Sequence, residues 1–485
     1  MELKNMKDIL KLNFKARHAG IAAMTNIAVL LVLIVLNLIV QEIPASWDMT
    51  RKKLFSLTEQ SKALLENMEQ EAVIYLLEKP GMESKEILEV LEKYDHASRM
   101  LRLEIIDPDR NPALISRYAE DGQEVPSGSV IVASGNYSRI IDRMDLYSIS
   151  QDQQGRPQIV GMTVEQRVSS ALSYVISGRE PGIYELEGHN EYRLADLNLA
   201  DAVNKANYRT KSLNLMKTGK VPSDADVLLI IAPERDLSDF EAKALEEYLA
   251  EGGSLFLAMG LSKEPFPLFN KLLISYNISL KKGVVMETNT NRLLPGMGNN
   301  PFFFAPYYPE ENPITDSLKE NSLDVFLFSV MGIDETEMQK QNMKVLPLLS
   351  TSNSSWLRTD MEQTSETRVG SDIPGPVITA VSVAETNRDT GKEDGARLIL
   401  LATGDFLSSV PGMGQVKANV ELFLNSLNWL SDQEDVINIS SKSLFRLPLR
   451  INALQAWIYA AIAILLIPLL IIICGTFVSL RRKNL

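Results

Sequence analysis

Residues 227–259 read VLLIIAPERDLSDFEAKALEEYLAEGGSLFLAM, and this stretch is the clearest indication of the fold class. The apolar run Val227–Ala232 has the length and composition of a buried strand. Ser238–Glu241 has the S-x-x-E pattern of a capping box and predicts the start of a helix. Two glycines end that helix, and the apolar run Ser254–Met259 follows. Strands that alternate with helices are typical of a parallel, doubly wound sheet.

The same alternation extends in both directions, and we expect residues 181–435 to form one α/β domain. Further strands are expected at Gly182–Leu186, Thr210–Leu215, Val325–Phe328, Val345–Leu349, Val377–Val383 and Leu398–Ala402. Helices are expected around Leu194–Ala206 and over Val420–Leu430. Two long stretches break the pattern and are expected to be functional or disordered loops; they are Thr288–Pro313 and Ser350–Pro376.

A smaller α/β unit precedes this domain, within residues 41–180. Its pattern is β-α-β-α-β-β-α, which suggests a thioredoxin-like arrangement. The expected strands are Ala72–Leu77, Leu101–Ile106, Ser129–Ala133 and Arg139–Asp142. Capping boxes at Ser56–Glu59 and Thr163–Gln166 predict the starts of its first and last helices, and Gly178 should end the last one.

Two uncharged apolar segments flank the body and predict transmembrane helices. Residues 21–40 and 454–480 are each long enough to cross a hydrocarbon layer of ~30 Å as a helix. A cleaved signal peptide, cut near Ala45, is the alternative for the first segment, but a typical signal core has only ~7–15 apolar residues. Residues 436–453, which precede the second expected span, are expected to form a juxtamembrane linker.

Charge predicts the orientation. Of the chain's 49 basic and 62 acidic side chains, the tail 1–20 holds five basic and two acidic ones, and the tail 481–485 holds three basic ones. Short tails rich in Lys and Arg stay cytoplasmic. We therefore expect both termini in the cytoplasm, the body 41–453 outside it, and the protein in the inner (cytoplasmic) membrane. This body has a net charge of -19, which argues against nucleic acid as a partner.

Motifs for the common catalytic chemistries are missing from the sequence. The single cysteine, Cys474, lies in the second expected span, so the body offers neither a disulfide nor a thiol nucleophile. The two Gly-Lys pairs continue with Val221 and Glu393 rather than with the Ser or Thr of a phosphate-binding loop. G-x-S-x-G is absent as well. We expect no catalytic residue, cofactor or metal, and no ATP hydrolysis by this chain.

Two turns could nevertheless bind a ligand. His189 and Glu191 follow a strand of the large domain, at the end where doubly wound sheets place their ligands. Asp405 follows a later strand in the same way. An enzyme hypothesis would rest on His189 and Asp405. The simpler interpretation is that both turns only connect strands to helices, because no second histidine is nearby and no HExxH helix exists.

An aromatic loop is the most unusual surface candidate. Prolines frame five aromatic side chains, which could dock a partner protein, stack on sugar rings or pack on their own domain; they are Phe302, Phe303, Phe304, Tyr307 and Tyr308.

Several segments together resemble the GldG-like auxiliary component of ABC-type transport systems associated with gliding motility. They are Trp47–Thr50 with Lys53–Thr58 (D-x-T…K-x-F-S-L-T), Ile106–Pro112 (DPD-x-NP), Glu165-Gln166, Glu187–Glu191 (x-G-H-x-E), Asp226–Pro233 with Tyr248–Gly253, Gly404-Asp405-Phe406 and Asn425–Leu430. The resemblance covers nearly the whole chain. It implies a flavodoxin- or amidotransferase-like second domain without a catalytic triad, and a separate ABC permease and ATPase as partners.

The leading hypothesis is a non-enzymatic, membrane-anchored accessory or substrate-handling subunit of an ABC-2-type transporter. Its spans would pack on the permease and its acidic body would bind substrate or shape the route outside the membrane. The alternative is an anchored extracytoplasmic sensor or glycan-binding module, which the aromatic loop motivates.

Overall fold

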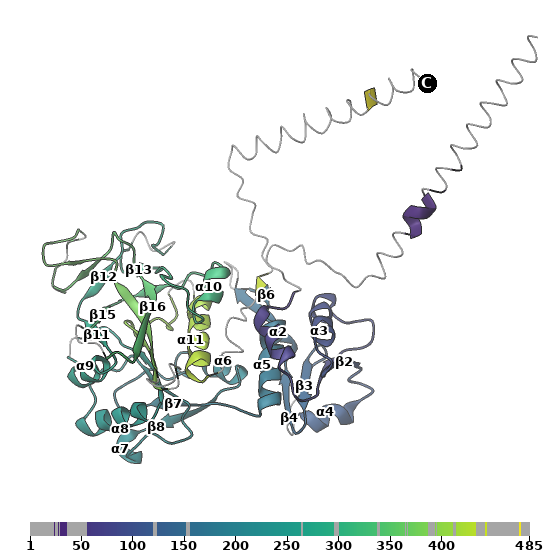
Figure 1. The fold of residues 1–485 in the computed structure, drawn as a ribbon, viewed down its shortest axis with the longest axis horizontal. Coiled ribbons are helices and arrows are strands. Elements are labelled where there is room, and N and C mark those ends of the chain that lie inside the picture. Colours follow the sequence, from purple (N-terminus) through teal and green to yellow (C-terminus); the bar gives the residue numbers. More distant parts are fainter. Residues whose placement is uncertain are drawn as a thin grey trace, which may run out of the picture. The chain divides into compact units, whose positions relative to one another are not determined.

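The computed structural model describes most of the body and little of the two flanking segments (Figure 1). The described residues are 24, 28, 30–35, 56–119, 124–151, 156–262, 265–294, 300–336, 340–363, 365, 367–386, 393, 395–410, 414–432, 442–443 and 475–476. In this part of the chain, none of the helices has both the length and the apolar character needed to cross a bilayer. More than half of the expected span at 21–40, and nearly all of the one at 454–480, lies outside the described residues.

Residues 59–177, here called the small domain, are built on a four-stranded sheet in the order β2-β1-β3-β4. β1 and β2 are parallel, while β3 is antiparallel to both β1 and β4. The apolar alternation of β1 and the fully buried β3 put the core at the centre of this sheet. The strands are β1 Ala72–Leu77, β2 Leu101–Ile106, β3 Val130–Ser134 and β4 Tyr137–Ile141.

Four helices complete the small domain: α2 Glu59–Glu66, α3 Lys85–Ala97, α4 Pro112–Tyr118 and α5 Val164–Ser177. α5 packs on β3 and β4 and ends at Gly178, whose φ of 63° is the left-handed conformation that glycine adopts easily. α2 begins later than expected, because Thr58 rather than Ser56 is its N-cap. Thr163 caps α5 as expected, but its hydroxyl donates to the Asp145 carbonyl instead of closing a capping box.

A hairpin that the sequence did not indicate follows the small sheet. The short helix η1 Arg143–Leu146 leads into β5 Tyr147–Gln151, which pairs with β6 Pro157–Met162. The late strand β21 Lys442–Ser443 pairs with the other edge of β6. The segment that leads toward 454–480 is thus attached to this hairpin.

Residues 182–430, here called the large domain, contain a nine-stranded sheet. Five of its strands are parallel and lie in the order β8-β7-β9-β10-β20. They are β7 Gly182–Leu186, β8 Arg209–Leu213, β9 Val227–Ile231, β10 Ser254–Ala258 and β20 Arg397–Leu401. Numbered along the chain, this is the 2-1-3-4-5 order of flavodoxin-like sheets. The parallel, doubly wound part is therefore as expected.

The other four strands of this sheet are antiparallel, so the sheet is mixed. They are β11 Ile278–Lys281, β15 Gly332–Glu335, β16 Met343–Ser350 and β19 Ile378–Glu385. Two small sheets lie beside them, formed by β12 Val284–Met286, β17 Trp356–Arg358 and β18 Ile373–Pro374, and by β13 Phe303–Phe304 and β14 Leu327–Phe328.

The helices of the large domain are α6 Ala200–Lys205, α7 Leu215–Thr218, α8 Asp239–Ala250, α9 Pro267–Ile274, α10 Asp316–Glu320 and α11 Lys417–Leu430. Phe423 of α11 packs edge-on against Phe256 of β10, with ring centroids 5.2 Å apart, so α11 covers the centre of the sheet. The Tyr208 hydroxyl, just after α6, donates to Asn428 of α11 at 2.6 Å, which places α6 beside α11 (Figure 1). The capping box of Ser238 and Glu241 on α8 is present as predicted.

Candidate functional site

The carboxyl edge of the parallel strands is the first place to look for a site. In the 2-1-3-4-5 order the winding reverses between β7 and β9, and ligands of such sheets bind in the crevice at that reversal. The turn after β7 carries His189, and the turn after β20 carries Asp405. The sequence-predicted turns therefore do belong to the same edge of the sheet.

His189 is buried at this edge between two carboxylates. Its Nδ1 lies 2.8 Å from Glu191 Oε1, and its Nε2 lies 3.2 Å from Glu241 Oε2. The hydrogen bond to Glu191, together with both negative charges, raises the pKa of His189. The ring thus favours the charged form, which donates from both nitrogens and leaves no lone pair for a metal or a proton. Because Glu241 is also the capping residue of α8, the cluster ties the β7 turn to that helix.

Asp405 is not joined to His189 in the described structure. Its carboxylate accepts instead from the Tyr192 hydroxyl at 3.5 Å. Burial raises the pKa of the Asp405 carboxyl. Gly404, the residue before Asp405, packs tightly against Ala232 in the turn after β9. A Cβ atom added at Gly404 would lie only 2.5 Å from the Cβ of Ala232. The turns after β9 and β20 therefore fill the space between them, and the geometry supports a connecting role for Asp405.

The aromatic loop divides into core and surface residues. Phe304 is fully buried, Phe303 stacks on Phe328 at 5.6 Å, and the Tyr308 hydroxyl donates to the Leu323 carbonyl at 2.6 Å. Phe302 and Tyr307 remain exposed, with 36% and 40% of their surface accessible. Of the five aromatic side chains, these two are the exposed ones, and the Arg292 guanidinium lies over one face of the Tyr307 ring, 4.6 Å from its centroid.

Tyr307 also borders a polar cavity of about 490 Å³. Its other walls are Asn289, residues 350–354 and Pro376. The buried Glu287 carboxylate holds these walls together by accepting from the Ser352 amide and hydroxyl, at 2.9 and 2.6 Å. No local sequence pattern indicates this cavity, because its walls come from segments about sixty residues apart.

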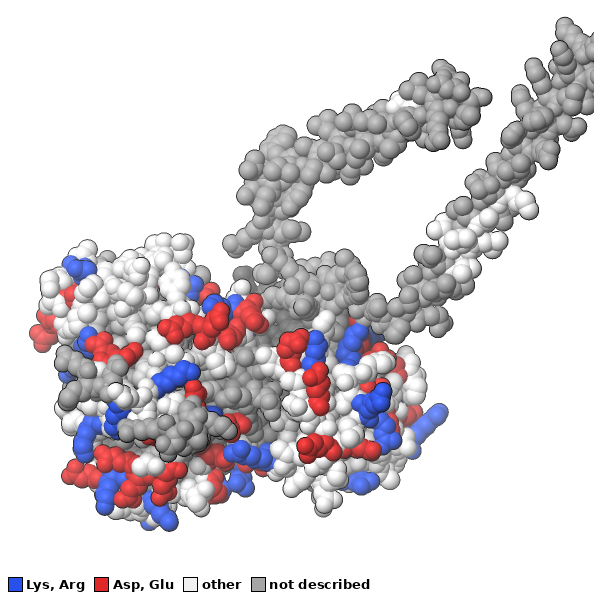
Figure 2. Space-filling view, viewed as in Figure 1, with Lys and Arg blue, Asp and Glu red and all other residues white. Residues whose placement is uncertain are grey.

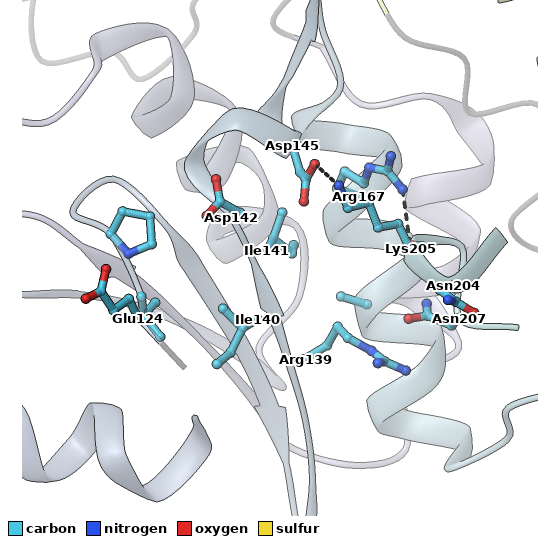
Figure 3. A pocket seen from close by; sticks show the side chains of 13 residues that line it. Glu124, Arg139, Ile140, Ile141, Asp142, Asp145, Arg167, Asn204, Lys205 and Asn207 are labelled. Atoms are coloured by element: carbon cyan, nitrogen blue, oxygen red, sulfur yellow. Dashed lines mark hydrogen bonds and ion pairs between the residues drawn. The ribbon is translucent and has the colours of Figure 1, made fainter. Parts of the chain in front are cut away.

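A second cavity, of about 290 Å³, lies where α5 and β4 of the small domain meet α6 of the large domain (Figure 3). Arg139 of β4, Arg167 of α5 and Asn207 after α6 contribute to its walls. Arg167 donates to the Lys205 carbonyl at 3.1 Å, and the Lys205 ammonium bonds Asp145 at 2.7 Å. This site has no signature in the sequence, because its residues come from separate elements and form no motif.

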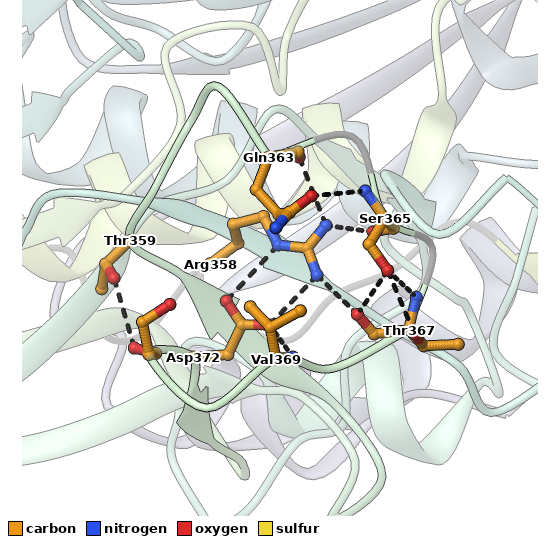
Figure 4. Close-up of polar contacts among 8 residues, drawn as sticks. Arg358, Thr359, Gln363, Ser365, Thr367, Val369 and Asp372 are labelled. Carbon is orange, nitrogen blue, oxygen red and sulfur yellow. Dashed lines mark hydrogen bonds and ion pairs between the residues drawn. The ribbon is translucent and has the colours of Figure 1, made fainter.

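The polar stretch that follows β17 is organised by one buried arginine (Figure 4). Arg358 is 3% exposed and pairs with the buried carboxylate of Asp372 at 3.0 Å. The same guanidinium donates to backbone carbonyls of Gln363, Ser365 and Thr367. The arginine lowers the pKa of Asp372 although burial opposes it. A buried, multiply bonded ion pair fits a structural role for this loop.

Charge on the visible surface is mixed. Acidic and basic side chains are interspersed on the face shown in Figure 2, and that face has no broad basic area. This agrees with the net acidic composition of the chain. A phosphate backbone would need such a basic area.

Comparison with known proteins gives one informative match. A family model described as "ABC-type uncharacterized transport system" matches residues 180–426, about half of the chain. A second model, "Domain of unknown function (DUF7088)", matches residues 51–140. The first match confirms the resemblance to an auxiliary component of ABC-type transport systems. No curated protein matches the chain.

Two solved structures show only distant similarity. The N-terminal domain of mmIFT52 is 12% identical over 51% of this chain and 96% of its own, with a TM-score of 0.34. The exo-beta-1,4-mannosidase Op5Man5 from Opitutaceae bacterium strain TAV5 is 11% identical over 72% of this chain and 47% of its own, with a TM-score of 0.24. Scores this low support no inference about fold or function.

Proposed function

Since the chain belongs to the ABC-type transport-system auxiliary family, we propose that it is a non-enzymatic, membrane-anchored accessory subunit of an ABC-2-type transporter. The family match over 180–426 is the observation that carries the proposal. The chain lacks a phosphate-binding loop, so a separate ATPase must supply the energy. A separate permease must supply the membrane path, because the sequence has only two long apolar segments.

The same proposal places the protein in the cytoplasmic membrane with both termini in the cytoplasm. The basic tails 1–20 and 481–485 support this orientation, and the acidic body would lie outside. In that position the two α/β domains bind the substrate or shape its route beyond the permease. The His189 cluster supports a non-catalytic role for this chain, because both ring nitrogens of His189 are hydrogen-bonded to carboxylates.

Co-purification from the native membrane tests the subunit proposal. Tagged full-length protein in mild detergent should bring down a Walker-type ATPase and a multi-span permease. Replacing the segment 454–480 by an unrelated membrane-spanning helix should weaken that association, whereas the double change Phe302→Ala and Tyr307→Ala should leave it intact. If neither transporter component accompanies the unmodified chain, the proposal fails.

A glycan-binding sensor is the second candidate, and the cavity beside Tyr307 favours it. Sugar sites often combine an exposed ring with hydroxyl and amide side chains, as Tyr307, Asn289 and Ser352 do here. Tyr307→Ala should then abolish retention on immobilised cell-wall glycan. Tyr137→Ala, which removes another exposed ring, is the matched control. Equal retention of both variants would eliminate this candidate.

A further inference from the structure

The cavity between α5, β4 and α6 has three wall atoms without partners. Arg139 Nε, Arg167 Nε and Asn207 Oδ1 are all buried, and none has a hydrogen-bond partner in the described part of the chain. Buried polar atoms in folded proteins are nearly always paired. Two donors and one acceptor that face the same cavity therefore indicate a ligand that supplies one or more acceptors and a donor.

The charges of the cavity indicate a negative ligand group. Arg139 is neutralised by Glu180 at 3.0 Å, and Lys205 by Asp145 and Asp201 at 2.7 and 2.8 Å. Arg167 differs, because its guanidinium donates to the Lys205 carbonyl and makes no direct ion pair among the described residues, although the charges of Asp145 and Asp201 act on it from a greater distance. Burial lowers the pKa of the Arg167 guanidinium, which nevertheless stays protonated in proteins. Asp145 and Asp201 are both already paired with Lys205, so an anion of the ligand in direct contact with Arg167 would compensate its charge more fully.

Asn207 sets a second requirement. Its side chain is held in one orientation, because Nδ2 donates to the Ser170 carbonyl and hydroxyl at 2.9 and 2.7 Å. The residue is 4% exposed, so its free Oδ1 must be reached by a donor on the ligand. A hydroxyl group is the donor that fits an anionic molecule.

Carboxylates in the walls of the cavity limit the total charge of the ligand. Glu124, Asp142 and Asp145 also line the cavity (Figure 3). Their carboxylates accept from hydroxyl groups but repel a second negative charge. The volume of about 290 Å³ is near the lower end for small-molecule sites.

We propose that this cavity binds a small hydroxylated monocarboxylate of the size and chemistry of a sugar acid. Its carboxylate lies on Arg167 and Arg139, and a hydroxyl group donates to Asn207 Oδ1. Because the cavity is formed by both domains, an occupied site fixes the small domain on the large one. The inference stands on the cavity alone and does not depend on a role in transport.

Calorimetry on the full-length chain in mild detergent tests the ligand chemistry. D-Glucuronate should bind, whereas D-glucose, which lacks the carboxylate, should bind about tenfold more weakly or not at all. Butanoate keeps one carboxylate but lacks the hydroxyls, and inorganic phosphate carries more charge, so both should also be at least about tenfold weaker. Absence of glucuronate binding, or tighter binding of phosphate than of glucuronate, overturns the proposal.

Variants then locate the site. Arg167→Gln should weaken glucuronate binding about tenfold or more, and Arg167→Lys should do so less, because it keeps the charge but loses the Nε donor. Arg110→Gln removes an exposed arginine of the same domain and should bind like the parent. If Arg167→Gln does not fold, Arg167→Lys and the four-ligand series decide. Equal affinity of the Arg167 and Arg110 variants for glucuronate contradicts the proposal. Co-purification of transporter components tests the proposed function and does not bear on this cavity.

Discussion

Glu421 on α11 shows what a single buried residue contributes. It is 6% exposed, its Oε1 has no hydrogen-bond partner in the described structure, and burial raises its pKa to about 7. The folded protein therefore binds this proton more tightly than the unfolded chain. Its stability contribution is full below the unfolded pKa near 4.5, and it is lost as the pH rises through about 7.

Glu421→Gln should accordingly stabilise the protein at pH 8 by on the order of 3 kcal/mol, with little change at pH 5. The glutamine keeps the shape of the side chain and carries no charge to desolvate. Urea unfolding of the full-length chain at both pH values measures the difference. Glu251→Gln, at the exposed end of α8, is the control and should change neither value. An equal gain in unfolding free energy at pH 5 and pH 8 would contradict a raised pKa at Glu421.

At the scale of elements, the His189 cluster joins the β7 turn to α8. The charged ring is stabilised by Glu191 and Glu241, all three side chains being 6% exposed or less. Because the pKa of His189 is raised, its contribution is full below 6.5 and is lost as the pH rises through the folded pKa.

His189→Ala should therefore cost roughly 3 kcal/mol of unfolding free energy at pH 6, since it leaves two buried carboxylates uncompensated. The cost should shrink at pH 9, where the parent ring is closer to neutral. Denaturant unfolding at both pH values checks this. His96→Ala, on the exposed side of α3, should have little effect. Loss of a hydrolytic activity without loss of stability would instead revive the enzyme hypothesis.

Strands that are rich in apolar residues and bounded by turn residues were the predictable elements. β1, β2 and β7 begin and end at the expected residues, because Ala72–Leu77 and Gly182–Leu186 combine strand composition with a clear break on each side. β11 and the β5–β6 hairpin were missed, because these strands are largely exposed or half-buried and contain no long apolar run. The N-cap of α2 was misplaced for a non-local reason: the Thr58 amide donates to Glu165, 107 residues later.

The candidate sites follow the same rule. The pairing of His189 with Glu191 is visible in the motif Glu187–Glu191, because the two residues are two positions apart. Its second partner, Glu241, is 52 residues away and was recognised only as a helix cap. The cavity at Arg167 was invisible, since neither a motif nor a periodicity connects β4, α5 and the turn after α6. Sequence patterns reveal local chemistry, whereas these sites are made by tertiary packing.

At the scale of the whole molecule, the distribution of charge predicts the orientation in the membrane. The body carries nearly all of the negative charge, and each flanking segment is followed or preceded by a short basic tail. Protease added to intact spheroplasts should therefore cleave the body at exposed basic residues such as Arg110, whose side chain is 85% exposed. A tag placed after Leu485 should stay protected until the membrane is permeabilised. Cleavage of the tag with an intact body would invert the proposed orientation, and with it the idea that this subunit handles substrate outside the cytoplasm.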